Sequence, residues 1–350
     1  MSSAPRKAAA TKFYGVGDDA AAPSDYRCHP GGLDGGPNGR RVGGVQWRMS
    51  NIPTTAPIPV ILNREAGRGW DDARVQELRD LFAREGLAVE IHADEDGRTL
   101  ADRTQEIVAR RPAMVVAAGG DGTVSAVASC LRGTGIPLAV LPVGTLNHFA
   151  RDLGLPSRVE DAVAAIAHGR AVGVDVGEVN ERAFINNASL GMYPDIVRDR
   201  TRQQRRLGRG KYWAMLWATW AVVRRSPFLR LRLEIDGREV YTRSPFVFVG
   251  NNDYTMEGFN IGARSSLRDG CLSIYTTRRR TRLGLLGLAL RALAGRLHQA
   301  EDFSIERAST LRIETRRRRI WVATDGELNA MMAPLTFRIV PGALRVIVPA

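Results

Sequence analysis

The chain has very little lysine, few cysteines and no long apolar run. Of its 350 residues 50 are lysine or arginine, yet only Lys7, Lys12 and Lys211 are lysine. None of these lies near a glycine-rich loop, which excludes the Walker phosphate loop, whose lysine reaches the nucleotide phosphates. The three cysteines lack metal or disulfide spacing, which fits a reducing cytoplasm. We find no signal peptide and no stretch able to cross a bilayer, and therefore expect a cytoplasmic protein.

Arginine carries almost all of the positive charge. The formal net charge is +13, which points to anionic partners such as a phosphorylated ligand, a membrane surface or a nucleic acid. Arginine runs at 278–280 and 316–319 fit either solvated edges of the fold or attraction to anionic lipid. No nucleic-acid-binding motif or aromatic stacking platform accompanies them, so we expect no nucleic-acid partner.

The strongest local signal is a glycine-rich loop between an apolar run and a helical pattern. Residues 114–118 fit a buried strand, three glycines then surround Asp121, and a helical pattern begins at Thr123. Glycine lets the backbone approach a phosphate, and a helix N-terminus favours negative charge. Because an aspartate would repel an anion unless a divalent cation lay between them, Asp121 indicates a metal–phosphate site. The plain alternative is a strand-to-helix turn.

An N-terminal tail precedes two regions of different character. Residues 1–56 are rich in Gly, Ala, Pro and charge without periodicity, which predicts disorder. Residues 57–170 alternate strands and helices, which predicts a doubly wound parallel-sheet nucleotide domain with ligand loops at the strand C-termini. Residues 171–350 predict a mostly antiparallel, β-rich substrate domain. The expected helices are 71–85, 100–110, 123–132, 161–168, 202–225 and 281–299, and the expected strands are 56–63, 87–92, 113–118, 137–142, 174–179, 183–187, 229–235, 245–250, 272–276, 311–314 and 320–323.

Six short motifs occur in the order found in one family of kinases. They are Asn63 with Gly67, and the segments 119–123, 142–145, 187–191, 267–272 and 324–327. From about residue 57 to its end the chain resembles the diacylglycerol kinase catalytic-domain family, most of all its soluble bacterial lipid kinases, which are related to sphingosine and ceramide kinases. NAD kinases share the first glycine loop, but their Asn-Glu and Gly-Ser-Thr-Ala-Tyr motifs are absent here.

This resemblance implies a nucleotide domain, a C-terminal β-sandwich and an active site in the cleft between them. It implies an ATP-dependent lipid kinase that uses Mg²⁺ and phosphorylates a hydroxyl of a diacylglycerol-like or sphingoid lipid. The residues expected to bind the nucleotide are Asn63, Gly67, Gly119, Gly120, Asp121, Gly122, Thr123, Val124, Gly144, Thr145 and Asn147.

Asp325 and Glu327 are the candidate catalytic residues. Asp325 follows an apolar strand and precedes a glycine. In similar kinases the matching aspartate is the general base, and the nearby glutamate lies close to the metal. From the spacing alone, Asp325 fits an ordinary type I′ hairpin turn equally well.

The resemblance adds a second Mg²⁺ position to the one that Asp121 indicates. In the family the matching loop holds a structural ion through an aspartate, here Asp269, and through backbone carbonyl groups, here those of Ser266 and Cys271. Oxygen ligands of this kind suit a hard cation.

Two positions depart from the family pattern. Many relatives carry glutamate at the position of Ala126 and aspartate at the position of His148. These changes leave open a catalytically impaired lipid-binding or regulatory protein of the same fold. A soluble-substrate kinase of the NAD-kinase type is a third hypothesis.

One stretch suggests how such an enzyme would meet a membrane. Trp213, Trp217 and Trp220 fall on one face of the helix expected at 202–225, and arginines flank them. Such a helix suits the headgroup region of an anionic bilayer, although packing into the core explains the tryptophans equally well. The expected partners are ATP and a lipid at a membrane surface, through peripheral contact, with a homodimer as a further expectation.

Overall fold

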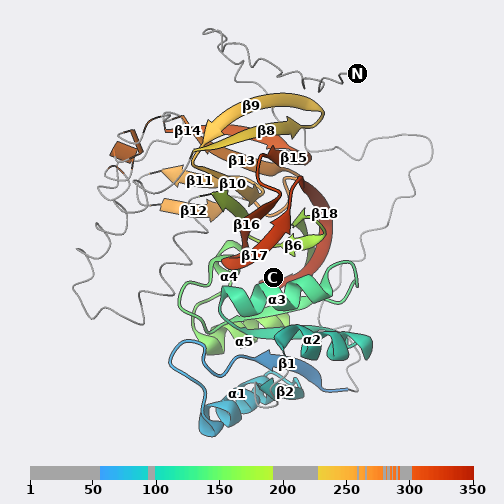
Figure 1. The fold of residues 1–350 in the computed structure, drawn as a ribbon. Coiled ribbons are helices and arrows are strands. Elements are labelled where there is room, and N and C mark those ends of the chain that lie inside the picture. The colour runs from blue at the N-terminus through green and yellow to red at the C-terminus, as the bar shows by residue number, and fades with distance from the viewer. Residues whose placement is uncertain are drawn as a thin grey trace, which may run out of the picture.

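The computed structural model describes residues 56–93, 99–191, 228–257, 260–264, 266–278 and 302–350, together with 281, 284, 285, 287, 288 and 291. Within these residues the chain forms an α/β half, drawn in blue and green in Figure 1, and a β-rich half that continues into yellow and red. The helix expected at 202–225, with its tryptophans, lies outside the described residues. Of the helix expected at 281–299, residues 284, 285, 287, 288 and 291 are described and helical.

The N-terminal half is a parallel sheet covered on both faces by helices. The strand order is β2-β1-β3-β4, and β1, β3 and β4 are buried along their whole length, as expected where helices cover both faces. Helices α1 and α5 pack on one face, and α2 and α3 pack on the other. The bounds of these elements are β1 (Ile58–Leu62), α1 (Asp72–Arg84), β2 (Val89–Ala93), α2 (Leu100–Ala109), β3 (Val115–Gly119), α3 (Asp121–Leu131), β4 (Leu138–Pro142), α4 (His148–Asp152) and α5 (Val159–His168).

The C-terminal half is a sandwich of two sheets. One sheet has the order β14-β13-β10-β7-β16-β17, and the other contains β5, β6, β18, β15, β8 and β9. Apolar side chains of both sheets meet in one core. The strands are β5 (Arg170–Val179), β6 (Arg182–Phe184), β7 (Asn187–Gly191), β8 (Leu229–Ile235), β9 (Arg238–Ser244), β10 (Phe246–Asn251), β13 (Leu272–Thr277), β14 (Phe303–Ala308), β15 (Thr310–Thr315), β16 (Arg319–Thr324), β17 (Glu327–Met332) and β18 (Leu335–Val348), beside a separate hairpin of β11 (Tyr254–Glu257) and β12 (Asn260–Arg264).

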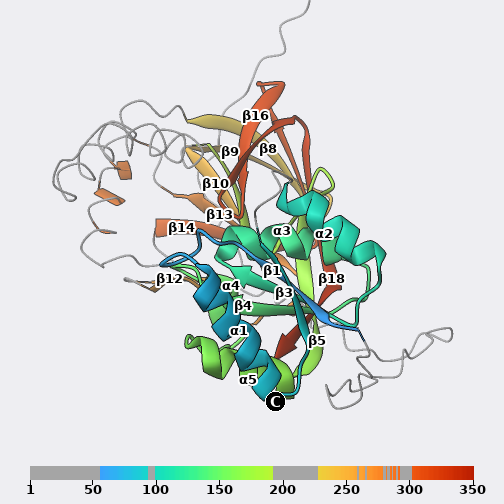
Figure 2. The same ribbon diagram turned by 90° about the horizontal axis from the view of Figure 1, so that it is seen from below.

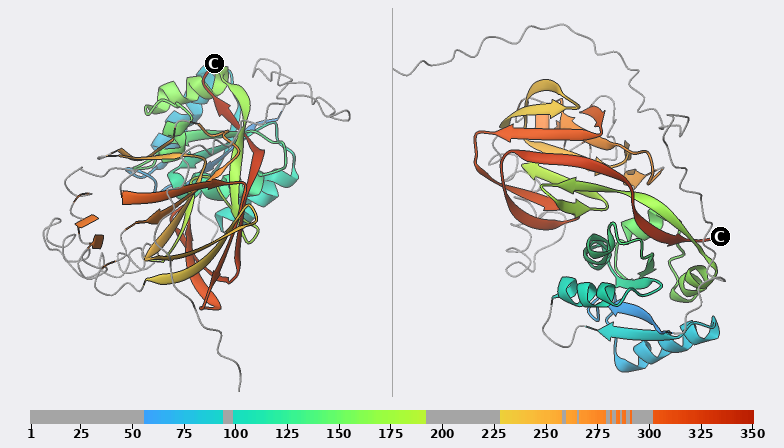
Figure 3. Two further views of the ribbon diagram at one scale, coloured as in Figure 1. Left: turned by 90° about the horizontal axis from the view of Figure 1, so that it is seen from above. Right: turned by 90° about the vertical axis from the view of Figure 1, so that its right-hand side faces the viewer.

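Strand β18 joins the two halves. Near its end Val346 pairs in parallel with Leu138 of β4, whereas residues 335–338 pair with β15 in the sandwich. Strand β5 runs antiparallel to β18 along most of its length. The right-hand view of Figure 3 shows these long strands passing from the sandwich to the α/β half, where the C-terminus lies. One continuous sheet therefore fixes how the two halves face each other.

The predicted fold class, a doubly wound parallel sheet followed by a mostly antiparallel sandwich, is confirmed. Strand β18 escaped prediction because Pro341-Gly342 looks like a break, whereas the strand continues through it with a shift of register between Val340 and Leu344. Strand β17 escaped because its sequence has no β-branched residue. No helix in the described part of the chain is both long enough and apolar enough for a transmembrane span.

Candidate active site

Three loops meet where the parallel strands β1, β3 and β4 end. The backbone N–H of Asn63, just after β1, donates to the Ala118 carbonyl of β3 at 3.0 Å. The Asn63 side-chain amide donates to the Thr123 hydroxyl of α3 at 3.4 Å. The carboxyl edge of an open α/β sheet is the usual ligand position in such folds. The structure thus brings the predicted nucleotide-binding loops together.

Two glycines let these loops touch through their backbones. A Cβ atom on Gly144 would lie 2.3 Å from the Gly120 Cα atom, and one on Gly67 would lie 2.4 Å from the Val143 carbonyl oxygen. Any side chain at either position would force the loops apart. Gly120, one of the residues in this close approach, is the N-cap residue of α3 and has no side chain.

Asp121 and Asn147 shape these loops. The Asp121 carboxylate accepts a hydrogen bond from the Phe149 N–H at 3.2 Å, which ties α3 to α4. The Asn147 side chain donates to the carbonyl groups of Pro142 and Gly144 and accepts from the Gly144 N–H, at 2.9–3.1 Å. Its amide therefore holds the loop after β4 in shape.

The Asp325 carboxylate is enclosed by hydrogen-bond donors. It accepts from the backbone N–H groups of Ile185, Asn186 and Asn187 at 2.8–3.0 Å. A fourth bond comes from the Ser125 hydroxyl of α3 at 2.5 Å. These four donors match the roughly four lone-pair sites of a carboxylate. Burial raises the pKa of Asp325, and the four hydrogen bonds oppose that shift.

Asp325 also forms a hairpin turn between β16 and β17. Asp325 and Gly326 have φ values of 48° and 87°, and Thr324 pairs with Glu327 across the turn, as in a type I′ turn. Asp236 and Gly237 form a similar turn between β8 and β9, with φ values of 45° and 83°. The turn alone does not distinguish Asp325; its contact with Ser125 does.

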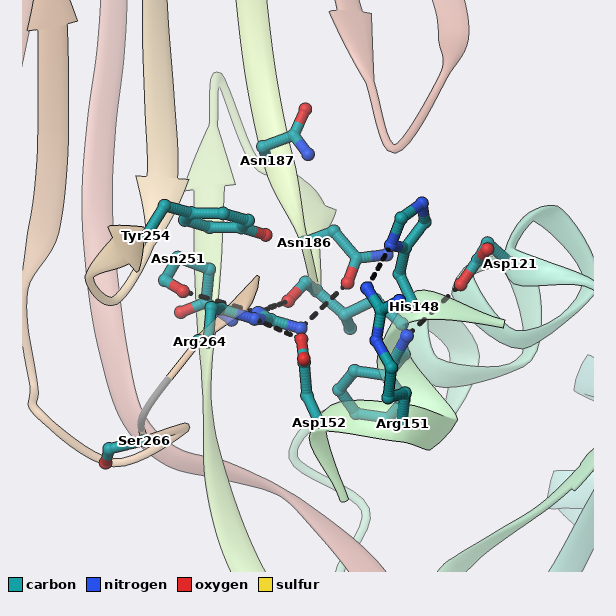
Figure 4. Close-up of polar contacts among 12 residues, drawn as sticks. Asp121, His148, Arg151, Asp152, Asn186, Asn187, Asn251, Tyr254, Arg264 and Ser266 are labelled. Carbon is teal, nitrogen blue, oxygen red and sulfur yellow. Dashed lines mark hydrogen bonds and ion pairs between the residues drawn. The ribbon is translucent and has the colours of Figure 1, made fainter. Parts of the chain in front are cut away.

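The buried guanidinium of Arg264 contacts the segment whose backbone binds Asp325, and Figure 4 shows these contacts of Arg264. Arg264 donates to the Asp152 carboxylate of α4 at 2.7 Å, to the Ile185 carbonyl at 2.7 Å and to the Asn186 side-chain oxygen at 2.8 Å. The side chains of Arg264 and Asp152 are 0% and 4% exposed, so the pair is fully desolvated. The Ile185 carbonyl belongs to the same peptide group as the Asn186 N–H that binds Asp325, and Arg264 therefore fixes that donor in place.

The fold and these motifs agree with two family models. The diacylglycerol kinase catalytic domain matches residues 57–179, and the YegS C-terminal NAD kinase beta sandwich-like domain matches residues 191–348. A Mycobacterium tuberculosis protein named diacylglycerol kinase is 32% identical over 250 residues, which cover 69% of this chain and 79% of that protein. The chain belongs to the diacylglycerol kinase catalytic-domain family.

Other relatives agree with this membership in the family. A Bacillus subtilis diacylglycerol kinase is 25% identical over 281 residues, covering 78% of this chain and 90% of that protein. A crystal structure of a putative diacylglycerol kinase from Bacillus anthracis has a TM-score of 0.66 at 23% identity, covering 83% of this chain and 97% of that chain, which shows the shared fold. Relatives named probable lipid kinase occur in Escherichia coli.

In this member of the family Glu327 lies at the rim of the site. Its carboxylate forms an ion pair with Arg182 at 2.8 Å, and both side chains are about half exposed, at 57% and 46%. Arg182 also donates to the Thr324 hydroxyl at 3.3 Å. Glu327 is thus held beside the Asp325 turn. Its assignment to catalysis stays a prediction.

The predicted ion loop is ordered by a residue that the sequence analysis did not identify. Asp175, which is buried, accepts from the Gly270 N–H at 2.8 Å and from the Gly342 N–H at 2.9 Å. The Cys271 carbonyl accepts from the Asn252 N–H at 3.0 Å. A structural ion held by Asp269 and the carbonyl groups of Ser266 and Cys271 stays a prediction.

The side chains near the glycine loops suit a Mg²⁺ ion that is bound together with a nucleotide better than one that protein side chains alone enclose. Within the described ranges, no three His, Cys, Asp or Glu side chains group as metal ligands. Mg²⁺ typically takes one or two carboxylates and completes its shell with phosphate oxygens and water. Asp121, at the first turn of α3 beside the glycine loops, fits that requirement.

His148 and Tyr254 line the same region in Figure 4. The His148 Nδ1 atom lies 2.8 Å from the Arg151 guanidinium, one turn along α4. Tyr254 hydrogen-bonds Asn187, and burial raises the pKa of its phenol. The Tyr254 ring lies 5.2 Å from the Arg264 guanidinium carbon. His148 is thus paired within its own helix, and the Tyr254 phenol stays neutral beside the backbone segment that donates to Asp325.

Sequence reasoning missed the residues that assemble this site, namely Ser125, Asp152, Asp175, Asn186 and Arg264. Asp152 and Arg264 are separated by 112 positions, and Ser125 and Asp325 by 200. No local pattern marks such pairs. The one available signal was Asp175, because a carboxylate in a run of valines cannot be buried without partners.

Proposed function

We propose that this protein is an ATP-dependent lipid kinase that transfers the γ-phosphoryl group to a hydroxyl of a diacylglycerol-like or sphingoid lipid. The family membership supports kinase activity, and relatives named diacylglycerol kinase and probable lipid kinase support a lipid acceptor. The observation that carries the proposal is the hydrogen bond from Ser125 to Asp325. It places a carboxylate of the sandwich against the helix that begins at the nucleotide loop.

In this proposal the glycine loops and the N-terminus of α3 hold the nucleotide phosphates. Asp121 would hold Mg²⁺, which when bound neutralises phosphate charge and orients the γ-phosphoryl group. The lipid hydroxyl oxygen attacks the γ-phosphorus, its proton passes to Asp325, and the bond from the γ-phosphorus to the bridging oxygen breaks to release ADP.

Ser125 is the donor that the lipid hydroxyl can replace. Three of the four donors to Asp325 are backbone N–H groups fixed by the strands, whereas the fourth is a serine hydroxyl that can rotate away. We propose that the acceptor hydroxyl takes the position of the Ser125 hydroxyl. Asp325 then receives its proton on the side that faces the nucleotide loops.

A catalytically impaired lipid-binding protein is the second candidate. Ala126 and His148 motivate it, because many relatives have carboxylates at these positions. The hydrogen bond from Ser125 argues for activity, because it holds the Asp325 carboxylate against the helix that begins at the glycine loop.

The deciding experiment incubates the purified full-length protein with Mg²⁺ and ATP labelled at the γ-phosphate. The acceptors are diacylglycerol, sphingosine, ceramide and, as a soluble acceptor, NAD. We expect label on a lipid. Label on NAD alone would favour the soluble-substrate kinase, and label on no acceptor together with retained binding to lipid vesicles would favour the impaired protein.

A further inference from the structure

The outer face of the β16–β17 hairpin is apolar and open to solvent. Ile320 and Val322 of β16 point into the sandwich core, so Arg319 and Trp321 point outward. The register pairs Arg319 with Met332 and Trp321 with Ala330, which places all four on the same face. Trp321 is 44% exposed and Met332 is 59% exposed, although both are large apolar side chains.

Four arginines lie at the end of this hairpin away from Asp325. Arginines 316–319 are all exposed. None of their side chains forms an ion pair or hydrogen bond with any residue in the described ranges. Residues 316–323 and 328–334 contain no aspartate or glutamate. We call this surface, made of arginines 316–319 with Trp321 and Met332, the arginine-ended face. Figure 2 shows β16 at the top of the view, at the end of the molecule opposite α1 and α5.

A single exposed apolar side chain is ordinary, but this combination is specific. Tryptophan is favoured at a membrane–water interface, where its ring meets the headgroups. Arginines beside it attract anionic lipid, and residues 316–323 and 328–334 of the hairpin supply no carboxylate that would oppose that attraction. We propose that the arginine-ended face docks on an anionic membrane surface. The proposal rests on the proposed lipid kinase activity and names the surface through which that site meets its lipid.

The position of the face relative to the candidate site supports this partner. Trp321 lies in β16, and Asp325 follows the last residue of that strand, four residues further on, which corresponds to about 13 Å of extended chain. A membrane that contacts Trp321 therefore brings lipid headgroups within reach of the Asp325 turn. A second copy of the chain is the other occupant to test, because β17 is an edge strand of its sheet.

The test measures binding of the full-length protein to phosphatidylcholine vesicles with and without phosphatidylglycerol. One variant replaces the four arginines 316–319 with glutamine, and another carries Trp321→Ala. The charge-matched control replaces four exposed arginines of the other half with glutamine, namely Arg79, Arg84, Arg110 and Arg111. The aromatic control is Tyr241→Ala, on a side chain that is 67% exposed on β9.

We expect the four-arginine variant to lose about tenfold or more in binding to the anionic vesicles. Trp321→Ala should weaken binding as well, both controls should bind like the unmodified protein, and added salt should weaken binding of the unmodified protein. Equal losses in the four-arginine variant and its control would overturn the proposal, because net charge alone would then explain binding. A dimer of the unmodified protein that Trp321→Ala converts to monomer would also overturn it.

Phosphorylation of a short-chain diacylglycerol dispersed in water separates this proposal from the proposed function. The four-arginine variant should phosphorylate the dispersed lipid like the unmodified protein and lose activity only on vesicles. If the unmodified protein phosphorylates no lipid in either form, the proposed function fails, whereas the vesicle-binding comparison still decides the docking surface.

Discussion

The Ser125 hydroxyl and the Asp325 carboxylate form a 2.5 Å hydrogen bond, between residues 200 positions apart in the chain. Ser125 lies on α3, the helix that begins at the glycine loop, and Asp325 lies at the tip of the β16–β17 hairpin. The bond joins the element that would hold the nucleotide to the carboxylate that would accept the proton. In the proposed mechanism each half of the chain contributes one part of the catalytic site.

Replacing Asp325 with asparagine tests its assignment as the general base. The change removes the proton acceptor at nearly constant size, so turnover should fall by about 10²–10⁴-fold. The control is Asp236→Asn, which makes the same substitution in a similar turn, where the carboxylate also accepts from backbone N–H groups, those of Ser309 and Thr310. The measurements are the kinase turnover and the thermal melting temperature of both variants. Equal turnover in the two variants would mean that Asp325 is only a turn residue.

The pH profile tests the electrostatics of the same carboxyl group. Burial raises the pKa of Asp325 above its ordinary value of 3.8, and a general base works only when deprotonated. Activity should therefore be lost on acidification at a higher pH than for an exposed aspartate. The hydrogen bond from Ser125 stabilises the charged form, so Ser125→Ala should move the acidic limb of kcat/KM to still higher pH.

Ser129→Ala is the matched control for this profile. Ser129 lies one turn further along α3, is exposed, and donates to the Ser125 carbonyl at 2.9 Å. Its profile should coincide with that of the unmodified protein. An acidic limb that Ser125→Ala leaves in place, or moves to lower pH, would contradict the assignment of that limb to Asp325.

Gly144→Ala tests the close approach of the nucleotide loops. Its Cβ atom would meet the Gly120 Cα atom at 2.3 Å, so the loops must separate at a cost of about 1–3 kcal/mol in the free energy of unfolding. The Michaelis constant for ATP should rise as well. In Gly122→Ala the new methyl group has no atom within 4 Å, so this variant should keep its stability. Chemical denaturation and ATP titration measure both effects, and unchanged values for Gly144→Ala would show that the loops do not need this contact.

Arg264→Gln tests the buried ion pair beneath Asp325. Asp152 would be left buried without its cation, which typically costs about 3–5 kcal/mol of stability. The control is Arg238→Gln, which breaks an exposed pair with Glu306 and should cost no more than about 1 kcal/mol. Arg264→Lys should not restore the native state, because an ammonium group cannot reproduce the contacts of the guanidinium. Chemical denaturation measures the free energy of unfolding of each variant. Equal losses in Arg264→Gln and Arg238→Gln would contradict this account.

The order of elements followed from the sequence because it depends on local pattern. Apolar runs and amphipathic spacing predicted most of the elements in the α/β half, and the glycines around Asp121 marked the end of a strand. The same local logic missed β18, which runs through Pro341-Gly342 and joins the two halves. Strand propensity depends on residues that are neighbours along the chain, whereas β18 forms because it pairs with β4 and β15.

The sequence by itself determined the fold class, the loop positions and the family, because these depend on the order and spacing of residues. The local turn pattern alone could not distinguish Asp325-Gly326 from Asp236-Gly237, since both form the same turn and both carboxylates accept backbone hydrogen bonds. Only the tertiary structure placed Ser125 against Asp325, and Arg264 against the backbone segment that donates to Asp325. The physical reason is that burial and the convergence of donors from distant segments give a carboxylate its chemistry, and neither is a property of the residues beside it in the chain.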